Sequence, residues 1–424
     1  MSAYWRSRWP GEDGGPRRYA VPLSGPSLDI QPGEPFSVTS RDAMASTMVV
    51  LRDPGEVYLL RHTMGVDTVS WVEQIDPETL EPIRRSPDLP GGPMWPGGLA
   101  AHANGSLYVV FGRYAHRLAS DLTVLASCEL PRDRPYNSFA ILPEGFIATK
   151  DFAGERPLTN PSADDPDNSE LVILEPENLE IIARLELPER SIARISLAHD
   201  DIYVVGDTRL MRIRWTDSST LTLDPDFGGL YRTQPGQTYG WDPVIAAGAA
   251  WFLDNGAGGD RYVGTMRDRG VSEAPLHLVR VNLMSGAVSL TEICGLPNGL
   301  IVNPPLIDPR RRIAVGYDSG NGVLAAFSFD DVGATTLLWR REQNHACHPM
   351  LFPETGELVT NDHDATRFMD QFVVLDIVTG EELLRADTGS AAQSVLFPAP
   401  GFGRDVYLCS FLNVSRLSIG GPSR

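Results

Sequence analysis

Short apolar runs alternate with turn residues along almost the whole chain, and they follow a repeat of about fifty residues. The clearest copy has an apolar run at 350–353 (MLFP), two β-rich runs at 357–362 (ELVTND) and 371–376 (QFVVLD), and a last run at 381–385 (EELLR). Runs of this length, rich in Val, Ile, Leu and Tyr and separated by Gly, Asp or Pro, are typical of β-strands. Each unit therefore predicts a four-stranded meander.

Similar units recur from end to end. Their first strands start near residues 47, 99, 139, 195, 244, 306, 350 and 395, so the spacing is 40 to 62 residues. Four-stranded units at this spacing are the signature of a β-propeller. The pattern predicts an all-β fold with one propeller of eight four-stranded blades. Seven blades is the alternative count, because the units at 47 and 395 are the least regular.

The last unit supplies only three strands, near 395–397, 405–411 and 414–419. A run at 19–22 (YAVP) could supply the fourth strand, which would close the ring and remove its open edges. We therefore expect one domain over residues 1–424, with an N-terminal arm at 1–18, a closing strand and lead-in at 19–46, and blades at 47–424.

Loops that precede first strands and loops that follow second strands meet on one face of a propeller, around the channel. The two long insertions of this chain, 153–169 and 255–275, both follow a second strand, and long loops on one face are where function tends to concentrate. The tryptophans of this face could stack a ring, or they could pack between blades. The candidate substrate-binding residues precede first strands: Trp95, Arg194, Trp241, Asp242 and Gln393.

Three histidines fall in one unit, two before its first strand and one after its second. His345, His363 and Asp362 are the candidates for proton transfer, because imidazole and carboxylate groups serve as general bases. The alternative is that these histidines are loop residues satisfied by backbone groups, and that the Asp is a turn residue.

Composition narrows the classes of partner. The net charge of −19 repels polyanions, so neither nucleic acid nor an anionic membrane surface is an expected partner. The N-terminus has no apolar signal region and the four cysteines form no CxxC pair, which favours a cytoplasmic protein with free thiols. A small molecule is the expected ligand. The oligomeric state is open, although a closed ring needs no partner at a strand edge, so a monomer is compatible.

No phosphate-binding loop, nucleophile elbow or HExxH motif is present, and the glycines at 256–259 lack the strand-then-helix context of a phosphate cradle. No nucleotide or flavin cofactor is therefore expected. A quinone-dependent dehydrogenase would suit eight blades, but the regularly spaced tryptophan motifs of that class are missing.

One stretch resembles a known family. Residues 294–300 (CGLPNGL), followed by 307–330, resemble the SMP-30/gluconolactonase/lactonase-like propellers, and 134–145 (RPYNSFAILPEG) is similar to that family's Asn-bearing start of another blade. The likeness covers about a quarter of the chain, and the family has six blades. It implies hydrolysis of lactones or related esters around one divalent cation, often Ca²⁺.

Carried over to this chain, the family's two asparagines are Asn137 and Asn298, and the family's Asp position falls near His348. No equivalent of the family's Glu is visible. If a divalent metal is bound, the best available donors are Asn137, Asn298, Asn303, Asp318 and His348.

Two functions are therefore predicted. The first is a small-molecule enzyme at the top of the channel, a lactonase- or esterase-like hydrolase or a related lyase or isomerase. The alternative is a non-catalytic propeller that binds a ligand or a protein partner on the same face, since the fold hosts both roles.

Overall fold

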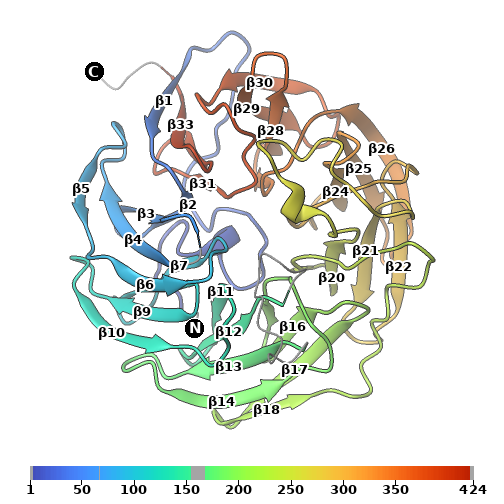
Figure 1. Cartoon of the computed structure of the whole chain (residues 1–424). Coiled ribbons are helices and arrows are strands. Elements are labelled where there is room, and N and C mark those ends of the chain that lie inside the picture. The colour runs from blue at the N-terminus through green and yellow to red at the C-terminus, as the bar shows by residue number, and fades with distance from the viewer. Residues whose placement is uncertain (1–2, 66, 154–167, 421–424) are drawn as a thin grey trace.

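The computed structural model describes residues 3–65, 67–153 and 168–420, and it forms a closed ring of eight antiparallel sheets (Figure 1). Within the described residues the helical elements are two short 3-10 turns, η1 (Glu12–Gly14) and η2 (Gly259–Arg261). The protein is thus an eight-bladed β-propeller, and the predictions of an all-β fold and of eight blades are confirmed.

The strands follow the ring in sequence order. Blade 1 contains β2 (Ser46–Leu51), β3 (Val57–His62), β4 (Thr68–Ile75) and β5 (Pro82–Arg85), with β6 (Leu89–Gly92) also paired to β4. Blade 2 contains β7 (Gly98–Ala101), β8 (Leu107–Phe111), β9 (Tyr114–Leu118) and β10 (Val124–Glu129). Blade 3 contains β11 (Tyr136–Ile141), β12 (Ile147–Asp151), β13 (Glu170–Leu174) and β14 (Ile181–Glu186). Blade 4 contains β15 (Ser196–Ala198), β16 (Asp201–Val205), β17 (Leu210–Thr216) and β18 (Thr220–Leu223).

The second half of the ring is built in the same way. Blade 5 contains β19 (Val244–Ala246), β20 (Ala249–Leu253), β21 (His277–Asn282) and β22 (Val288–Glu292). Blade 6 contains β23 (Leu306–Asp308), β24 (Ile313–Asp318), β25 (Val323–Phe329) and β26 (Thr335–Glu342). Blade 7 contains β27 (Met350–Phe352), β28 (Glu357–Asp364), β29 (Met369–Asp376) and β30 (Glu382–Asp387). Blade 8 contains β31 (Pro398–Pro400), β32 (Asp405–Cys409), β33 (Asn413–Ile419) and β1 (Phe36–Asp42).

The burial of the strands explains why the blades could be predicted from the sequence pattern. Inner strands such as β8 are buried at every position, whereas outer strands such as β10 are largely exposed. A strand covered on both faces is apolar throughout, so the inner strands give the clearest signal. The observed first strands start within three residues of the predicted positions; the largest shifts are at Tyr136 and Pro398.

The ring is closed by a different segment from the one predicted. Strand β1 pairs with β33 from Phe36 opposite Ile419 to Asp42 opposite Asn413, and the run at 19–22 belongs to no strand. The prediction of an N-terminal closing strand is therefore confirmed, and its placement at Tyr19 is wrong. Strand β1 is an outer strand with mostly exposed or half-buried positions, so it has no apolar run that would have revealed it.

The N-terminal arm crosses the centre of the ring, where Figure 1 shows its dark-blue trace. It exchanges backbone hydrogen bonds with the innermost strands of several blades. The N–H of Leu51 donates to Trp9, that of Leu197 to Pro16, that of Ile245 to Arg17 and that of Leu351 to Ala20, over 2.7 to 3.0 Å. Leu51 is the last residue of β2, and Leu197, Ile245 and Leu351 are the middle residues of their three-residue strands. The arm therefore lies against the first strands that line the channel.

Two further sequence predictions can be compared with the structure. All four cysteines are free. No helix in the described part of the chain is long and apolar enough to cross a membrane. Most of the insertion at 153–169 lies outside the described residues, whereas the insertion at 255–275 is described and carries η2.

Candidate functional site

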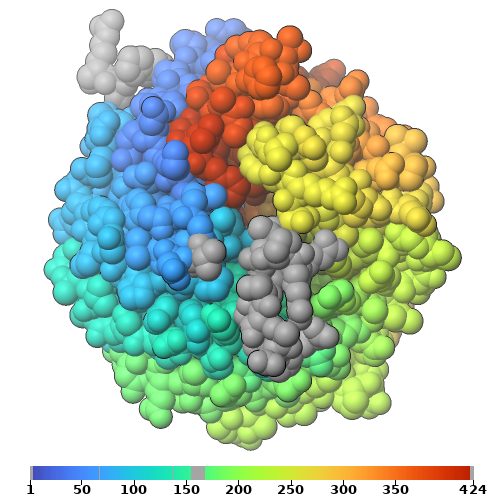
Figure 2. Space-filling view, viewed as in Figure 1, coloured from blue at the N-terminus to red at the C-terminus, as the bar shows by residue number. Residues whose placement is uncertain are grey.

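A cavity of about 300 Å³ opens at the channel mouth, and we call it the mouth cavity. Figure 2 shows this face hollowed near its centre, where blue, yellow and red segments meet. Its lining comes from loops that precede first strands or follow second strands, which is the face predicted from the sequence. The lining residues are Met64, Met94, Trp95, Pro96, Arg194, Trp241, Gly259, Asp260, Tyr262, Met266, Val302, Asn303, Val395, Leu396 and Phe411.

Aromatic rings form two of its walls. The rings of Trp95 and Trp241 lie 6.3 Å apart, and Trp95 stacks on Phe152 at 4.5 Å. Tyr262 meets Phe411 edge to face at 5.8 Å. Aromatic walls with flexible methionines between them favour a flat apolar ligand.

Local backbone features fix two of these rings. Gly256 lies against Trp241, and a Cβ at this glycine would come within 2.0 Å of the indole nitrogen. The hydroxyl of Tyr262 donates to the carbonyl oxygen of Gln393 at 2.8 Å. The side-chain oxygen of Gln393 accepts the backbone N–H of Met266 at 2.8 Å. Gln393 therefore holds the glycine-rich insertion against the cavity.

A buried arginine, Arg194, belongs to the lining of the cavity. Asp242 accepts two hydrogen bonds from Arg194, one from its backbone N–H at 2.6 Å and one from Nη1 at 3.0 Å. Nη2 has no hydrogen-bond partner among the described residues, and the buried Nε also makes no hydrogen bond there. Arg194 thus lines the cavity with donor capacity that the protein does not use.

Beneath Arg194 lies the arm. Glu12 Oε2 is 3.7 Å from Arg194 Nε and 2.7 Å from Arg18 Nη1, and it accepts the hydroxyl proton of Ser138 at 2.8 Å. Asp13 Oδ1 accepts a hydrogen bond from Nδ1 of His348 at 3.0 Å. We call the buried charged residues here the floor cluster: Glu12, Asp13, Arg18, Lys150, Arg194 and Asp242.

Burial and charge act on this cluster in opposite directions. Burial raises the pKa of Glu12 despite the nearby arginines. Burial also opposes ionisation of Asp13, but the charge and hydrogen bond of His348, together with Arg18 and Arg194, outweigh it and lower the pKa of that carboxyl. Burial lowers the pKa of Lys150 to about 8, although Asp151 and Asp242 favour its charged form. These shifts follow from desolvation and from opposite charges.

The predicted substrate-binding residues come together here. Trp95, Arg194 and Trp241 line the mouth cavity, Asp242 holds Arg194, and Gln393 holds the insertion. The predicted proton-transfer residues do not, because none of His345, Asp362 and His363 is among the lining residues.

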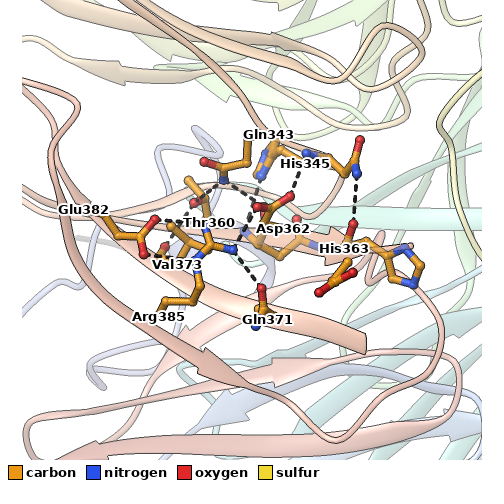
Figure 3. Close-up of polar contacts among 12 residues, drawn as sticks. Gln343, His345, Thr360, Asp362, His363, Gln371, Val373, Glu382 and Arg385 are labelled. Atoms are coloured by element: carbon orange, nitrogen blue, oxygen red, sulfur yellow. Dashed lines mark hydrogen bonds and ion pairs between the residues drawn. The ribbon is translucent and has the colours of Figure 1, made fainter. Parts of the chain in front are cut away.

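Figure 3 shows those three residues in a separate polar group on blade 7, the rim cluster. Asp362 accepts the backbone N–H of Asn344 and a hydrogen bond from Arg385, both at 2.8 Å. His363 Nε2 lies 3.1 Å from the carbonyl oxygen of Ala391. His345 is fully buried, and this burial lowers its pKa to about 3. Asp362 is satisfied by its neighbours, whereas the buried Nε2 of His345 and Nδ1 of His363 have no hydrogen-bond partner among the described residues.

The predicted metal donors lie in different environments in the structure. Asp318 accepts hydrogen bonds from the backbone N–H of Leu300 and from Asn321. Asn298 lies exposed with its φ at 60°. His348 contacts Asp13, and Asn303 donates to the carbonyl oxygen of Val395 at 2.9 Å.

Asn137 lies in β11, and its side chain is outside the described residues. In the described part of the chain no group of three or more His, Cys, Asp or Glu side chains is placed to hold a metal ion. The residues present therefore do not fit a divalent cation as a common donor set, and bound Ca²⁺ stays a prediction.

Sequence reasoning missed two sets of residues. Tyr262 and Met266 lie in the insertion at 255–275, which was recognised as functional without its aromatic residue being singled out. Glu12, Asp13 and Arg18 could not be predicted as site residues, because no local sequence feature of the arm indicates that it enters the channel.

No family model matches the sequence, and no curated protein matches it either. Solved structures match in fold. The Dos1 propeller is 10% identical with a TM-score of 0.56, over 92% of this chain and 96% of that chain. The computationally designed Ika8 protein is 11% identical with a TM-score of 0.57, over 95% and 99%. A streptogramin B lyase is 9% identical with a TM-score of 0.47, over 77% and 95%. These similarities show the fold alone: the neighbours of this chain are β-propellers, and membership of the SMP-30 family stays a prediction.

Proposed function

We propose that this protein is an enzyme that acts on a small, largely apolar molecule in the mouth cavity, as a hydrolase or lyase. The observation that carries the proposal is the cavity itself, with aromatic walls and a buried arginine in its lining. Concave apolar sites with a few convergent polar groups are typical of small-molecule sites. A protein partner would instead favour a flat apolar surface.

The chemistry assigned to Arg194 is stabilisation of negative charge. Asp242 fixes the guanidinium, and Nη2 has no hydrogen-bond partner among the described residues. Hydrolysis of an ester and elimination from a carbonyl compound both build negative charge on an oxygen atom. A preorganised donor in a water-poor site stabilises that charge more than water does.

The test is turnover of a panel of neutral aryl esters and lactones by the purified full chain, followed by product chromatography. Arg194→Gln should lower kcat/KM by about a hundredfold, the usual effect of losing one such donor. Arg310→Gln is the matched control, because this exposed arginine pairs with Glu354 on the outside of the ring. Equal activity of both variants would remove Arg194 from the chemistry, and no turnover of any panel member would refute the hydrolase.

The second candidate is a propeller that binds its ligand without converting it. It is favoured by one observation: among the described residues that line the cavity, the ionisable side chains include Arg194, Asp260 and Tyr262 but no histidine. Binding of a panel member without turnover would support this candidate. Trp241→Leu should weaken such binding, and Trp71→Leu, outside the cavity on β4, should not.

A divalent metal is tested separately. Elemental analysis for Ca, Zn, Fe and Mn would compare the natural chain with the Asn137→Ala, His348→Ala double variant. Equal metal content in the two proteins would discard these residues as ligands.

A further inference from the structure

The floor cluster has balanced charges. Three cations (Arg18, Arg194 and Lys150) stand against three carboxylates (Glu12, Asp13 and Asp242), each less than a tenth exposed. Asp151 adds no net charge, because it pairs with Arg134 at 2.9 Å. These six side chains together therefore carry no net charge.

This balance changes what Arg194 implies for a ligand. An arginine at the end of a cavity would ordinarily attract an anion. Here Asp242 holds one edge of the guanidinium and Glu12 lies 3.7 Å from Nε, so the positive charge is already compensated. An anionic or cationic ligand would place an uncompensated charge in an apolar cavity, and such a charge is costly.

Two of the three carboxylates come from the N-terminal arm. Glu12 and Asp13 lie in η1, whose approach to the blades needs the glycine at the start of β7. A Cβ at Gly98 would come within 2.3 Å of Glu12 Oε1. The arm therefore controls the charge of a cavity whose walls come from the blades.

We infer that the N-terminal arm makes the mouth cavity selective for uncharged ligands, with Glu12 as the specificity-determining residue beneath Arg194. The inference rests on the proposed function in one respect only, that a small molecule occupies this cavity. Arg194 then meets a neutral hydrogen-bond acceptor of the ligand through Nη2.

The test uses three probes with the same ring: 2-naphthylmethanol, 2-naphthoate and 2-naphthylmethylammonium. Their affinities for the full chain at neutral pH would be measured by quenching of tryptophan fluorescence and by calorimetry. The alcohol should bind most tightly, and each ion about tenfold or more weakly, because one uncompensated charge near buried groups costs at least this much.

The variant Glu12→Gln removes one negative charge and leaves a side chain of the same shape. The floor cluster then carries one excess positive charge, so the affinity for 2-naphthoate should rise about tenfold while that for the alcohol stays within about twofold. Glu34→Gln is the matched control, because Glu34 pairs with Arg404 away from the cavity, and it should change none of the three affinities.

The outcomes separate the two proposals. If none of the probes binds, occupancy of the cavity fails, and with it the proposed function. If 2-naphthoate binds the natural chain as tightly as the alcohol, the cavity is a ligand site and the charge selectivity is refuted, even where Glu12→Gln does not fold. Unchanged 2-naphthoate affinity in a folded Glu12→Gln protein overturns the role of Glu12.

Discussion

One arginine–aspartate pair lies in the floor cluster, and another joins Asp362 of the rim cluster to Arg385, in different surroundings. On the rim, Arg385 and Asp362 form a pair whose side chains are 30% and 20% exposed, and Arg385 also contacts Gln371 and Glu382. In the floor cluster, Arg194 and Asp242 are 3% and 0% exposed, and two nitrogens of Arg194 have no hydrogen-bond partner in the described residues.

The difference teaches which polar groups are available to a ligand. A partly exposed ion pair contributes little to stability. A buried charge with unused donors beside a cavity carries both an energetic cost and a binding capacity. Residue type pointed to the histidines of the rim cluster, which do not line the cavity, whereas Arg194 combines burial and unused donors with a place in the cavity lining.

The largest expected effect comes from breaking the buried pair. Asp242→Ala leaves Arg194 buried without its main partner, so the free energy of unfolding should fall by about 3–5 kcal/mol. Asp362→Ala on the rim should cost less than about 1 kcal/mol, because its pair is partly exposed. Urea unfolding of both variants measures the difference. Equal decreases in the free energy of unfolding would contradict the claim that the buried pair matters more than the partly exposed one.

A smaller effect is expected where the arm meets blade 2. Gly98→Ala places a methyl group against Glu12, which Arg18 and Ser138 hold in place, so the free energy of unfolding should fall by about 1–3 kcal/mol. Gly403→Ala is the control, because its new Cβ would make an ordinary contact at 3.4 Å. Thermal unfolding of the two variants decides the point, and an unchanged Tm for Gly98→Ala would mean that the arm does not need this close approach.

The smallest effect is a pH dependence from His345. Burial lowers its pKa from 6.5 to about 3, so the unfolded chain binds a proton between these values that the folded chain does not. Stability is therefore lost as pH falls below 6.5, by about 1.4 kcal/mol from this group near pH 5.5.

His345→Gln should remove this contribution, so the drop in the free energy of unfolding between pH 7.5 and 5.5 should become smaller than in the natural chain. His199→Gln, at an exposed turn, should leave the drop unchanged. A drop of the same size in all three proteins would show that His345 is not held neutral by the fold.

Much of the architecture could be predicted from local pattern. The run at Met350 and its partner strands were placed correctly because short runs with apolar, buried residues are bounded there by turn residues. Trp95, Arg194 and Trp241 were placed at the mouth because they precede first strands, and the propeller repeat brings these positions together. Strand β1 escaped prediction because an exposed outer strand has weak periodicity.

The sequence by itself determined the repeat and the face on which the loops gather, and it favoured eight blades over seven, because each depends on contacts within one blade of about fifty residues. Only the tertiary structure decided that the arm enters the channel and places Glu12 and Asp13 beneath Arg194. Asp13 meets His348 across 335 positions of sequence, and Glu12 meets Ser138 across 126. Such contacts leave no periodic trace, since they depend on where the closed ring places the arm, and the charge of the cavity depends on them.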